Sequence, residues 1–114
     1  MLKELERRIL ASCADGHVEL SVMLAKVAEA SGASEPGSLR QKAMAIVTNL
    51  LDLGLIRAGR PTPDGKAFVA WNLESKESVA RIYREWDSLG RAPKSGDIVW
   101  FAATKEGVRV VAAK

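Results

Sequence analysis

The chain has 114 residues and a net charge of +3, and 47% of its residues are hydrophobic and 27% charged. This composition excludes a disordered chain and predicts one globular domain that buries a core without disulfides or metals. Because Cys13 is the only cysteine, we expect a buried thiol and a reducing, cytoplasmic environment. No apolar run reaches the ~18 residues of a membrane span, and residues 1–10 lack the apolar core of a signal peptide, so we expect no membrane partner.

Charge is unevenly distributed along the chain. Residues 1–35 hold four basic and six acidic side chains, whereas residues 36–70 hold five basic and two acidic ones. The remaining residues hold eight basic and six acidic side chains. The middle third is therefore electropositive, which suits contact with a phosphate backbone and is equally compatible with a solvated surface.

Two helices are predicted in the first part of the chain. Apolar residues recur at helical spacing over residues 2–14, with charged residues on the other side. A short strand is expected at residues 17–20, after a turn at Asp15 and Gly16. Ser21 is expected to cap a second helix over residues 22–31, which Gly32 ends.

A third helix is predicted over residues 39–53. Ser38 and Gln41 have the spacing of a capping box, in which the hydroxyl accepts from the helix start and the glutamine reaches back. Gly54 stands where a left-handed residue ends a helix. The apolar residues of this segment fall on one face, namely Leu39, Ala43, Ile46, Val47, Leu50 and Leu53.

A β-hairpin is predicted over residues 55–72. Residues 55–58 and 67–71 are prone to form strands, and residues 59–66 between them are dense in glycine, proline and aspartate. Arg60 and Lys66 give this tip a basic character. The hairpin is therefore expected to carry positive charge away from the core.

The last part of the chain is predicted to add a helix and a β segment. Ser75 is expected to cap a helix over residues 76–89, and residues 97–104 contain a strand of the buried type. Residues 105–113 are compatible with a helix or a strand. The β-branched Val108, Val110 and Val111 favour the strand.

The residues indicate neither an active site nor a metal site. His17 is the only histidine, and its pairing with Cys13 lacks the second pair of ligands that zinc needs. The segment from Gly59 to Ala67 has one residue too many for a phosphate-binding loop and lacks the final serine or threonine. The carboxylates are scattered. We therefore expect no enzyme, no catalytic residue, no metal and no cofactor.

The order helix, short strand, helix, helix, hairpin resembles the winged helix-turn-helix superfamily. The resemblance is carried by Leu20-Ser21-Val22-Met23-Leu24 and Leu50-Leu51-Asp52-Leu53-Gly54-Leu55-Ile56, and it covers residues 2–72. It implies an α+β fold, a winged helix-turn-helix with an added C-terminal helix and β segment. Residues 1–114 would form one domain, with a core and wing over 1–72 and an extension over 73–114 that is available for dimerisation.

The resemblance also implies a transcriptional regulator that binds double-stranded DNA. The third helix would enter the major groove, and the hairpin would meet the backbone. Gln41 would contact adenine, Thr48 a thymine methyl group or a phosphate, and the basic side chains the phosphates. The residues implied for DNA contact are Ser38, Arg40, Gln41, Lys42, Thr48, Arg57, Arg60 and Lys66. For this function the five basic ones should share one face.

Two questions stay open from the sequence. Some superfamily members serve only as protein-contact modules, and the weakly basic third helix fits that alternative, with a protein partner on the C-terminal half. The apolar face of the helix over residues 76–89 is expected either to form a homodimer or to pack within the chain against Trp71 and Trp100. That face consists of Val79, Ile82, Tyr83, Trp86 and Leu89.

Overall fold

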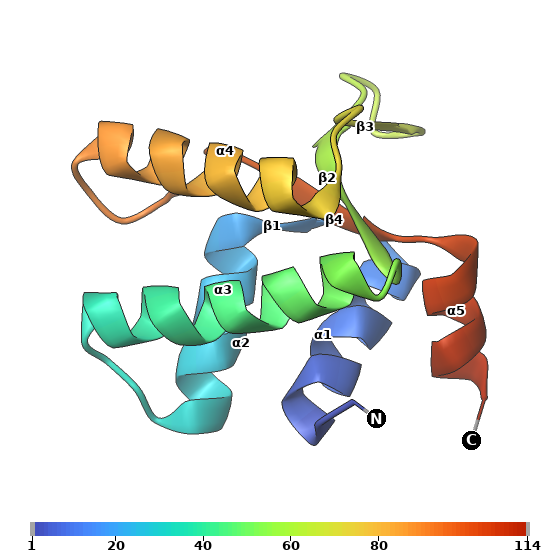
Figure 1. Ribbon diagram of the computed structural model, residues 1–114, viewed down its shortest axis with the longest axis horizontal. Helices are drawn as coiled ribbons and strands as arrows, with labels where there is room; N and C mark the ends of the chain where they lie inside the picture. The colour runs from blue at the N-terminus through green and yellow to red at the C-terminus, as the bar shows by residue number, and fades with distance from the viewer. Residues whose placement is uncertain (1, 114) are drawn as a thin grey trace.

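A computed structural model describes residues 2–113 of the chain as a layer of helices beside one antiparallel sheet (Figure 1). The helices are α1 (Glu4–Asp15), α2 (Leu20–Ser31), α3 (Pro36–Asp52), α4 (Ser75–Leu89) and α5 (Lys105–Ala112). The strands are β1 (Val18–Glu19), β2 (Ile56–Pro61), β3 (Phe68–Ala70) and β4 (Trp100–Ala103). The predicted α+β class is confirmed.

The sheet has the strand order β1-β4-β2-β3. The expected hairpin forms, with Gly59 opposite Ala70 in β2 and β3. β4 lies between β1 and β2, where Phe101 pairs with both Val18 and Ala58. The part of the chain after the hairpin thus supplies a strand, β4, to the middle of the sheet, and β1 and β3 form the sheet edges.

The core lies between this sheet and helices α1 to α4. Ile56 and Ala58 are buried while Arg57 between them is exposed, as expected of a strand with one covered face. The largest fully buried side chains come from α1, α2, α3, α4 and β4, among them Ile9, Leu10, Leu20, Met23, Met44, Leu50, Ile82 and Phe101. Cys13 belongs to this core as predicted, and burial raises the pKa of its thiol to about 12.

The predicted starts of three helices are wrong, for related reasons. α3 begins at Pro36 instead of residue 39, because proline suits the first helical position and its missing N–H needs no partner there. Ser38 therefore lies inside the first turn, and the expected capping box with Gln41 does not form. α2 begins at Leu20, so Ser21 is also within its helix. In each of these helices a glutamate, and not the predicted serine, is the residue before the first turn.

The start of α4 shows this most clearly. Ser75 is its first residue and not its cap. Glu74 is the cap, and its backbone N–H donates to Glu77 Oε1 at 3.1 Å. The predicted glycine stops are confirmed, because Gly32, Gly54 and Gly90 all adopt left-handed backbone conformations just beyond their helices.

The ambiguous tail forms a helix, and the preference for a strand was wrong. The Thr104 hydroxyl accepts from the Gly107 N–H at 3.0 Å, which caps α5. The same hydroxyl donates to the Gly54 carbonyl at 2.7 Å and so ties α5 to the end of α3. Val110 and Val111 pack against the core beside α1, a burial that outweighs their intrinsic strand propensity.

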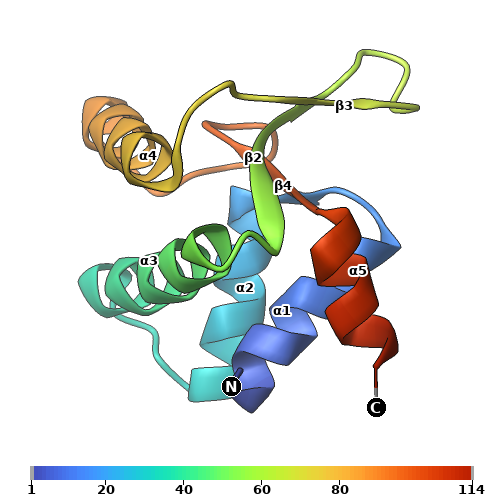
Figure 2. The ribbon, with the colours of Figure 1, turned by 45° about the vertical axis from the view of Figure 1, so that its right-hand side comes forward.

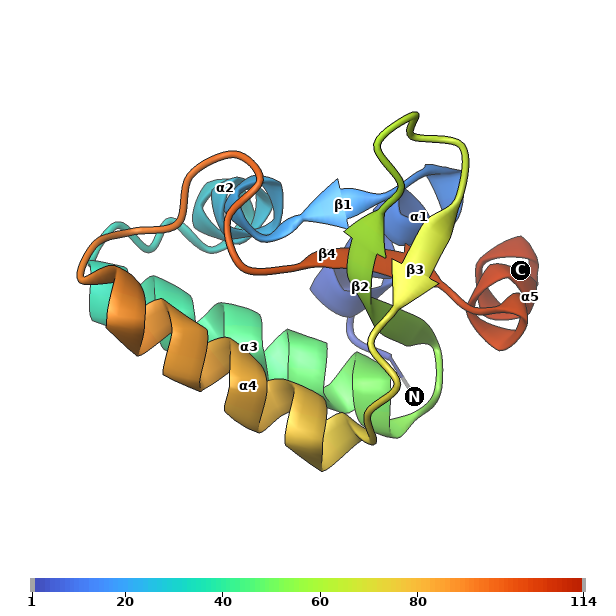
Figure 3. The same ribbon diagram turned by 90° about the horizontal axis from the view of Figure 1, so that it is seen from above.

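Helices α4 and α5 lie on opposite sides of the hairpin formed by β2 and β3 (Figure 2). α4 runs antiparallel to α3 along its length, and α5 packs beside α1 (Figure 3). Ile82 and Trp86 of α4 are buried, and Val79, Tyr83 and Leu89 pack partly against the core. The apolar face of α4 thus packs within the chain, with α3 alongside it, which is one of the two alternatives expected from the sequence.

Candidate functional site

Arg40, a predicted phosphate contact on α3, is engaged by α4. Its Nη1 lies 2.8 Å from Asp87 Oδ1. Its guanidinium carbon lies 4.8 Å from the ring centroid of Tyr83 and 5.0 Å from that of Trp86. Cation–π contact and the ion pair together hold the side chain against α4. Its charge is therefore largely used inside the molecule.

The other predicted contacts on α3 remain on its open side. Gln41 and Lys42 are exposed, while Ser38 and Thr48 are half-buried. Lys42 borders a hollow that Lys3 and Ser31 also line, on the side of α3 away from α4. This part of α3 is therefore accessible and carries one positive charge.

The predicted wing residues also separate. Arg60 points back to the loop before β4, where Nη1 donates to the Gly96 carbonyl at 3.1 Å. Arg57 lies over the Phe68 ring, with its guanidinium carbon 5.5 Å from the centroid. Lys66 is exposed at the tip. Arg40 thus points to α4, Lys42 lies on the α1 side of α3, and Arg60 points to the loop before β4. Arg57 and Lys66 lie on the hairpin. The five basic candidates therefore do not share one face.

The layer formed by α3 and α4 carries no excess charge on its surface. Its exposed basic side chains are Lys42, Lys76 and Arg84, and its exposed acidic ones are Asp52, Glu77 and Asp87. The Ser75 hydroxyl donates to the Asp52 carboxylate, which adds a second polar link between the two helices. A surface of this balance offers little attraction for a phosphate backbone.

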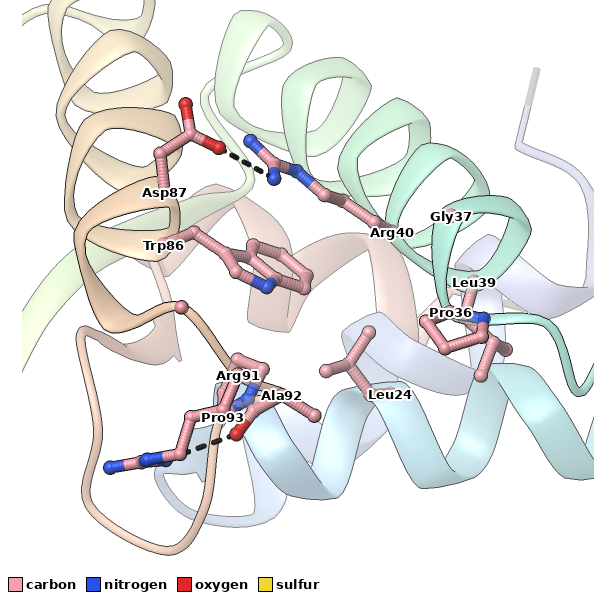
Figure 4. Close-up of a pocket in the computed structure, with 11 residues that line it drawn as sticks. Leu24, Pro36, Gly37, Leu39, Arg40, Trp86, Asp87, Arg91, Ala92 and Pro93 are labelled. Atoms are coloured by element: carbon pink, nitrogen blue, oxygen red, sulfur yellow. Dashed lines mark hydrogen bonds and ion pairs between the residues drawn. The ribbon is translucent and has the colours of Figure 1, made fainter.

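A cleft of about 580 Å³ opens at the end of this layer, between α2, the start of α3, the end of α4 and the loop that follows it (Figure 4). Because α3 and α4 are antiparallel, the first turn of one and the last turn of the other meet there. The lining is largely apolar and consists of Leu24, Pro36, Gly37, Leu39, Arg40, Trp86, Asp87, Gly90, Arg91, Ala92 and Pro93. Sequence analysis did not predict this site, because its residues come from three separate parts of the chain without a motif.

Trp86 contributes the one aromatic ring in the cleft lining. Its side chain is only 8% exposed, and the edge that carries the indole N–H faces the cleft (Figure 4). Within residues 2–113 no atom accepts a hydrogen bond from this N–H, and it is not sealed off from solvent. The indole is a hydrogen-bond donor only. The cleft therefore has an apolar wall and an indole donor that is open to water.

Residues 90–93, at the start of the loop over residues 90–99, form the outer wall of the cleft, and an ion pair and hydrogen bonds hold the loop in place. Arg91 turns outward and donates to the Ala92 carbonyl at 3.0 Å (Figure 4). Its Nη1 also pairs with Asp97 Oδ2 at 2.8 Å. Hydrogen bonds from Arg91 and from the Lys94 backbone hold the pKa of Asp97 below its usual value. The buried Glu19 carboxylate accepts from the Gly96 N–H at 3.0 Å. Glu19 of β1 and the ion pair between Arg91 and Asp97 thus hold this loop in position.

A second group of basic residues lies on the other side of the hairpin. Arg57, Lys105 and Arg109 line one hollow of about 640 Å³ between β2 and the start of α5. Arg109 also pairs with Glu106 at 3.1 Å. Sequence analysis missed Lys105 and Arg109, because the tail was not assigned as a helix and their proximity to Arg57 depends on the position of β4.

Among residues 2–113, no group of three or more histidine, cysteine, aspartate or glutamate side chains is placed to hold a metal ion. No helix in this range is long and apolar enough to cross a membrane. Comparisons with protein-family models, curated proteins and solved structures found no match to the chain. Its function has to be argued from its own surfaces.

Proposed function

We propose that the chain is a winged-helix domain that serves as a protein-contact module, with the cleft between α2, α3 and α4 as the contact site. The order α1-β1-α2-α3 followed by a hairpin supports the winged-helix assignment. The observation that carries the function is the apolar cleft beside Trp86. Buried tryptophan and arginine are the residue types that most often dominate protein interfaces.

The position of α4 argues against base reading by α3. A major groove is about 12 Å wide and admits one helix, whereas two helices packed at about 8–10 Å between axes are nearly twice as wide. α4 lies along α3 and occupies Arg40. The balanced charge of the two exposed helix surfaces would also give few phosphate contacts. Both facts favour the protein-contact alternative over a DNA-reading helix.

Site-specific photo-crosslinking in cells that express the chain tests the proposal. A photoreactive residue at Ala92, which is exposed and lines the cleft, is compared with one at Ala80, which is exposed on α4 outside it. We expect a protein adduct from position 92 only, and its loss when Leu24→Trp fills the cleft. Equal adducts from both positions, or none from position 92, would contradict the proposal.

Duplex DNA binding remains a second candidate, and the hollow lined by Arg57, Lys105 and Arg109 favours it. In this version the wing and the start of α5 hold the phosphate backbone, with Lys66 at the hairpin tip. About three neutralised phosphates predict a slope near −3 for log K against log salt. Titration with duplex DNA at several salt concentrations measures this slope. Triple substitution of the three residues by glutamine should abolish binding, whereas Arg84→Gln should leave it unchanged.

A further inference from the structure

We infer that β3 pairs with β3 of a second copy of the chain, antiparallel and about a two-fold axis at Val69, so that the two sheets join into one. The apolar face of α4 packs within the chain, so a dimer needs another surface. β3 lies on the outer side of the hairpin, away from the helices (Figure 2). This inference concerns the sheet edge and not the cleft, so it goes beyond the proposed function and either can fail without the other.

The first observation is the direction of the backbone groups of β3. The Trp71 N–H donates to the Ala58 carbonyl of β2 at 2.8 Å. Because the backbone groups of an antiparallel strand alternate in direction, those of Phe68 and Ala70 point away from β2. Within residues 2–113, β2 is the only strand beside β3. The open edge of β3 therefore offers two N–H donors and two carbonyl acceptors.

The second observation is that this edge lacks protection. Residues 67–71 contain no charged residue and no proline, and the Val69 side chain is 61% exposed. The pairing of β3 with β2 runs without a bulge. Edge strands usually carry charges, proline or a bulge, because an open edge pairs readily with another chain. The opposite edge, β1, has only two residues, so each copy has one edge of this kind, and self-pairing gives a closed dimer.

The third observation is the number of hydrogen bonds that each register allows. Phe68 and Ala70 are the residues of β3 with outward backbone groups, and in an antiparallel pair such residues exchange two bonds with the residue opposite. If Phe68 lies opposite Ala70 of the second copy, this exchange occurs twice and gives four bonds. A shift by two residues leaves one exchange within β3 and two bonds. The favoured register therefore has its axis at Val69.

The side chains fit the same register. The two exposed Val69 side chains lie opposite each other and cover one another at the axis, where cross-strand pairs of β-branched residues are favourable. Every other pair joins a large side chain to a small or uncharged one: Phe68 with Ala70, Trp71 with Ala67, and Lys66 with Asn72. No like charges lie opposite each other along these residues. The edge is thus complementary to itself, which favours a second copy as its partner.

Sedimentation analysis of the full chain up to ~1 mM tests for the dimer, because four hydrogen bonds and one small apolar contact predict weak association. We expect the average mass to rise with concentration toward twice that of the chain. Val69→Lys places two like charges opposite each other and should weaken association about tenfold. Val22→Lys, at an exposed valine on α2, is the matched control and should leave association unchanged. A parent chain that stays monomeric over this range would overturn the inference.

A second variant tests the backbone pairing itself. Ala70→Pro removes an N–H that points away from β2, and proline is tolerated at such a position of an edge strand. The dimer would lose two of its four hydrogen bonds, so association should weaken about tenfold while the urea midpoint of the monomer stays near that of the parent. If Val69→Lys and Ala70→Pro both associate like the parent, the contact lies elsewhere and the inference is overturned.

Crosslinking locates the axis. Residues opposite each other in a pair without mutual hydrogen bonds have Cα atoms about 4.5 Å apart, which is within the range of a disulfide. In a glutathione redox buffer, Val69→Cys should therefore form a disulfide dimer about tenfold faster than Val22→Cys, because the two thiols are held together. Cys13 is buried in both variants. Equal rates at the two positions would overturn the pairing about Val69.

Discussion

The two basic regions of the chain, α3 and the hairpin, have opposite fates in the folded molecule. On α3, α4 lies alongside and takes Arg40 into an ion pair and two aromatic contacts. On the hairpin, Arg57 stays exposed and is joined by Lys105 and Arg109 from α5. The difference shows that a basic residue packed between two helices is less available to a ligand than one that stays exposed beside a strand.

The largest expected effect concerns the anchor of α5, on which the basic hollow depends. A Cβ at Gly107 would lie 2.1 Å from the Leu55 carbonyl oxygen. Gly107→Ala should therefore destabilise the fold by about 3 kcal/mol, although alanine is the better helix former by ~1 kcal/mol. Gly16→Ala is the control, since open space surrounds that position. Chemical denaturation measures both, and a Gly107→Ala variant as stable as the parent would contradict the packing described.

The next effect tests how firmly α4 is held against α3. Ile82 is fully buried in α4, so Ile82→Ala should lower the free energy of unfolding by about 3 kcal/mol. Val69 on β3 is 61% exposed, and Val69→Ala should cost less than ~0.5 kcal/mol. Thermal and urea unfolding compare the two. Similar losses at both positions would show that α4 is no more integral to the fold than the hairpin edge.

These predictions depend on features that the sequence indicated only in part. The apolar stripe of α3 and its stop at Gly54 were readable, because helical spacing and a left-handed glycine are local signals. The start of α3 was misplaced because Ser38 and Pro36 are both good starting residues, and proline prevails here. The helical tail was not readable, since the burial of Val110 and Val111 depends on the distant α1.

The candidate site was out of reach for a similar reason. Arg40 and Trp86 were each singled out, one as a phosphate contact and one as part of an apolar face. Their contact follows from the antiparallel packing of α3 and α4, which no local pattern fixes. The position of β4 in the middle of the sheet likewise brings Lys105 and Arg109 to Arg57. Pairing across long sequence separations is therefore what sequence reasoning lacked.

A smaller effect compares one arginine from each region. Arg40→Gln removes a half-buried ion pair and cation–π contacts, and should destabilise the fold by about 1 kcal/mol. Arg57→Gln should cost less than ~0.5 kcal/mol, because an exposed guanidinium over one ring contributes little. Paired urea titrations test this order. A larger loss for Arg57 would reverse the comparison between the two regions.

The smallest effect is a pH dependence shared by the loop before β4 and the hairpin. Hydrogen bonds hold the pKa of Asp97 in that loop and of Asp64 at the hairpin tip below the ordinary 3.8. Because the folded pKa is the lower one, the stabilising contribution is present above pH 3.8 and is lost as the pH falls through the folded value. Carboxyl titration by NMR measures both groups. Arg91→Gln should raise the pKa of Asp97 and leave that of Asp64 unchanged.

The central claim is that this molecule binds at the cleft beside Trp86 and not through a DNA-reading α3. The most direct measurement pairs an NMR titration of the ¹⁵N-labelled chain with duplex DNA at low salt and the photo-crosslinking at position 92. We expect that the exposed α3 residues Gln41 and Ala45 do not respond to DNA, while position 92 gives a protein adduct. Strong shifts at Gln41 and Ala45 with DNA, and no adduct from position 92, would contradict the claim.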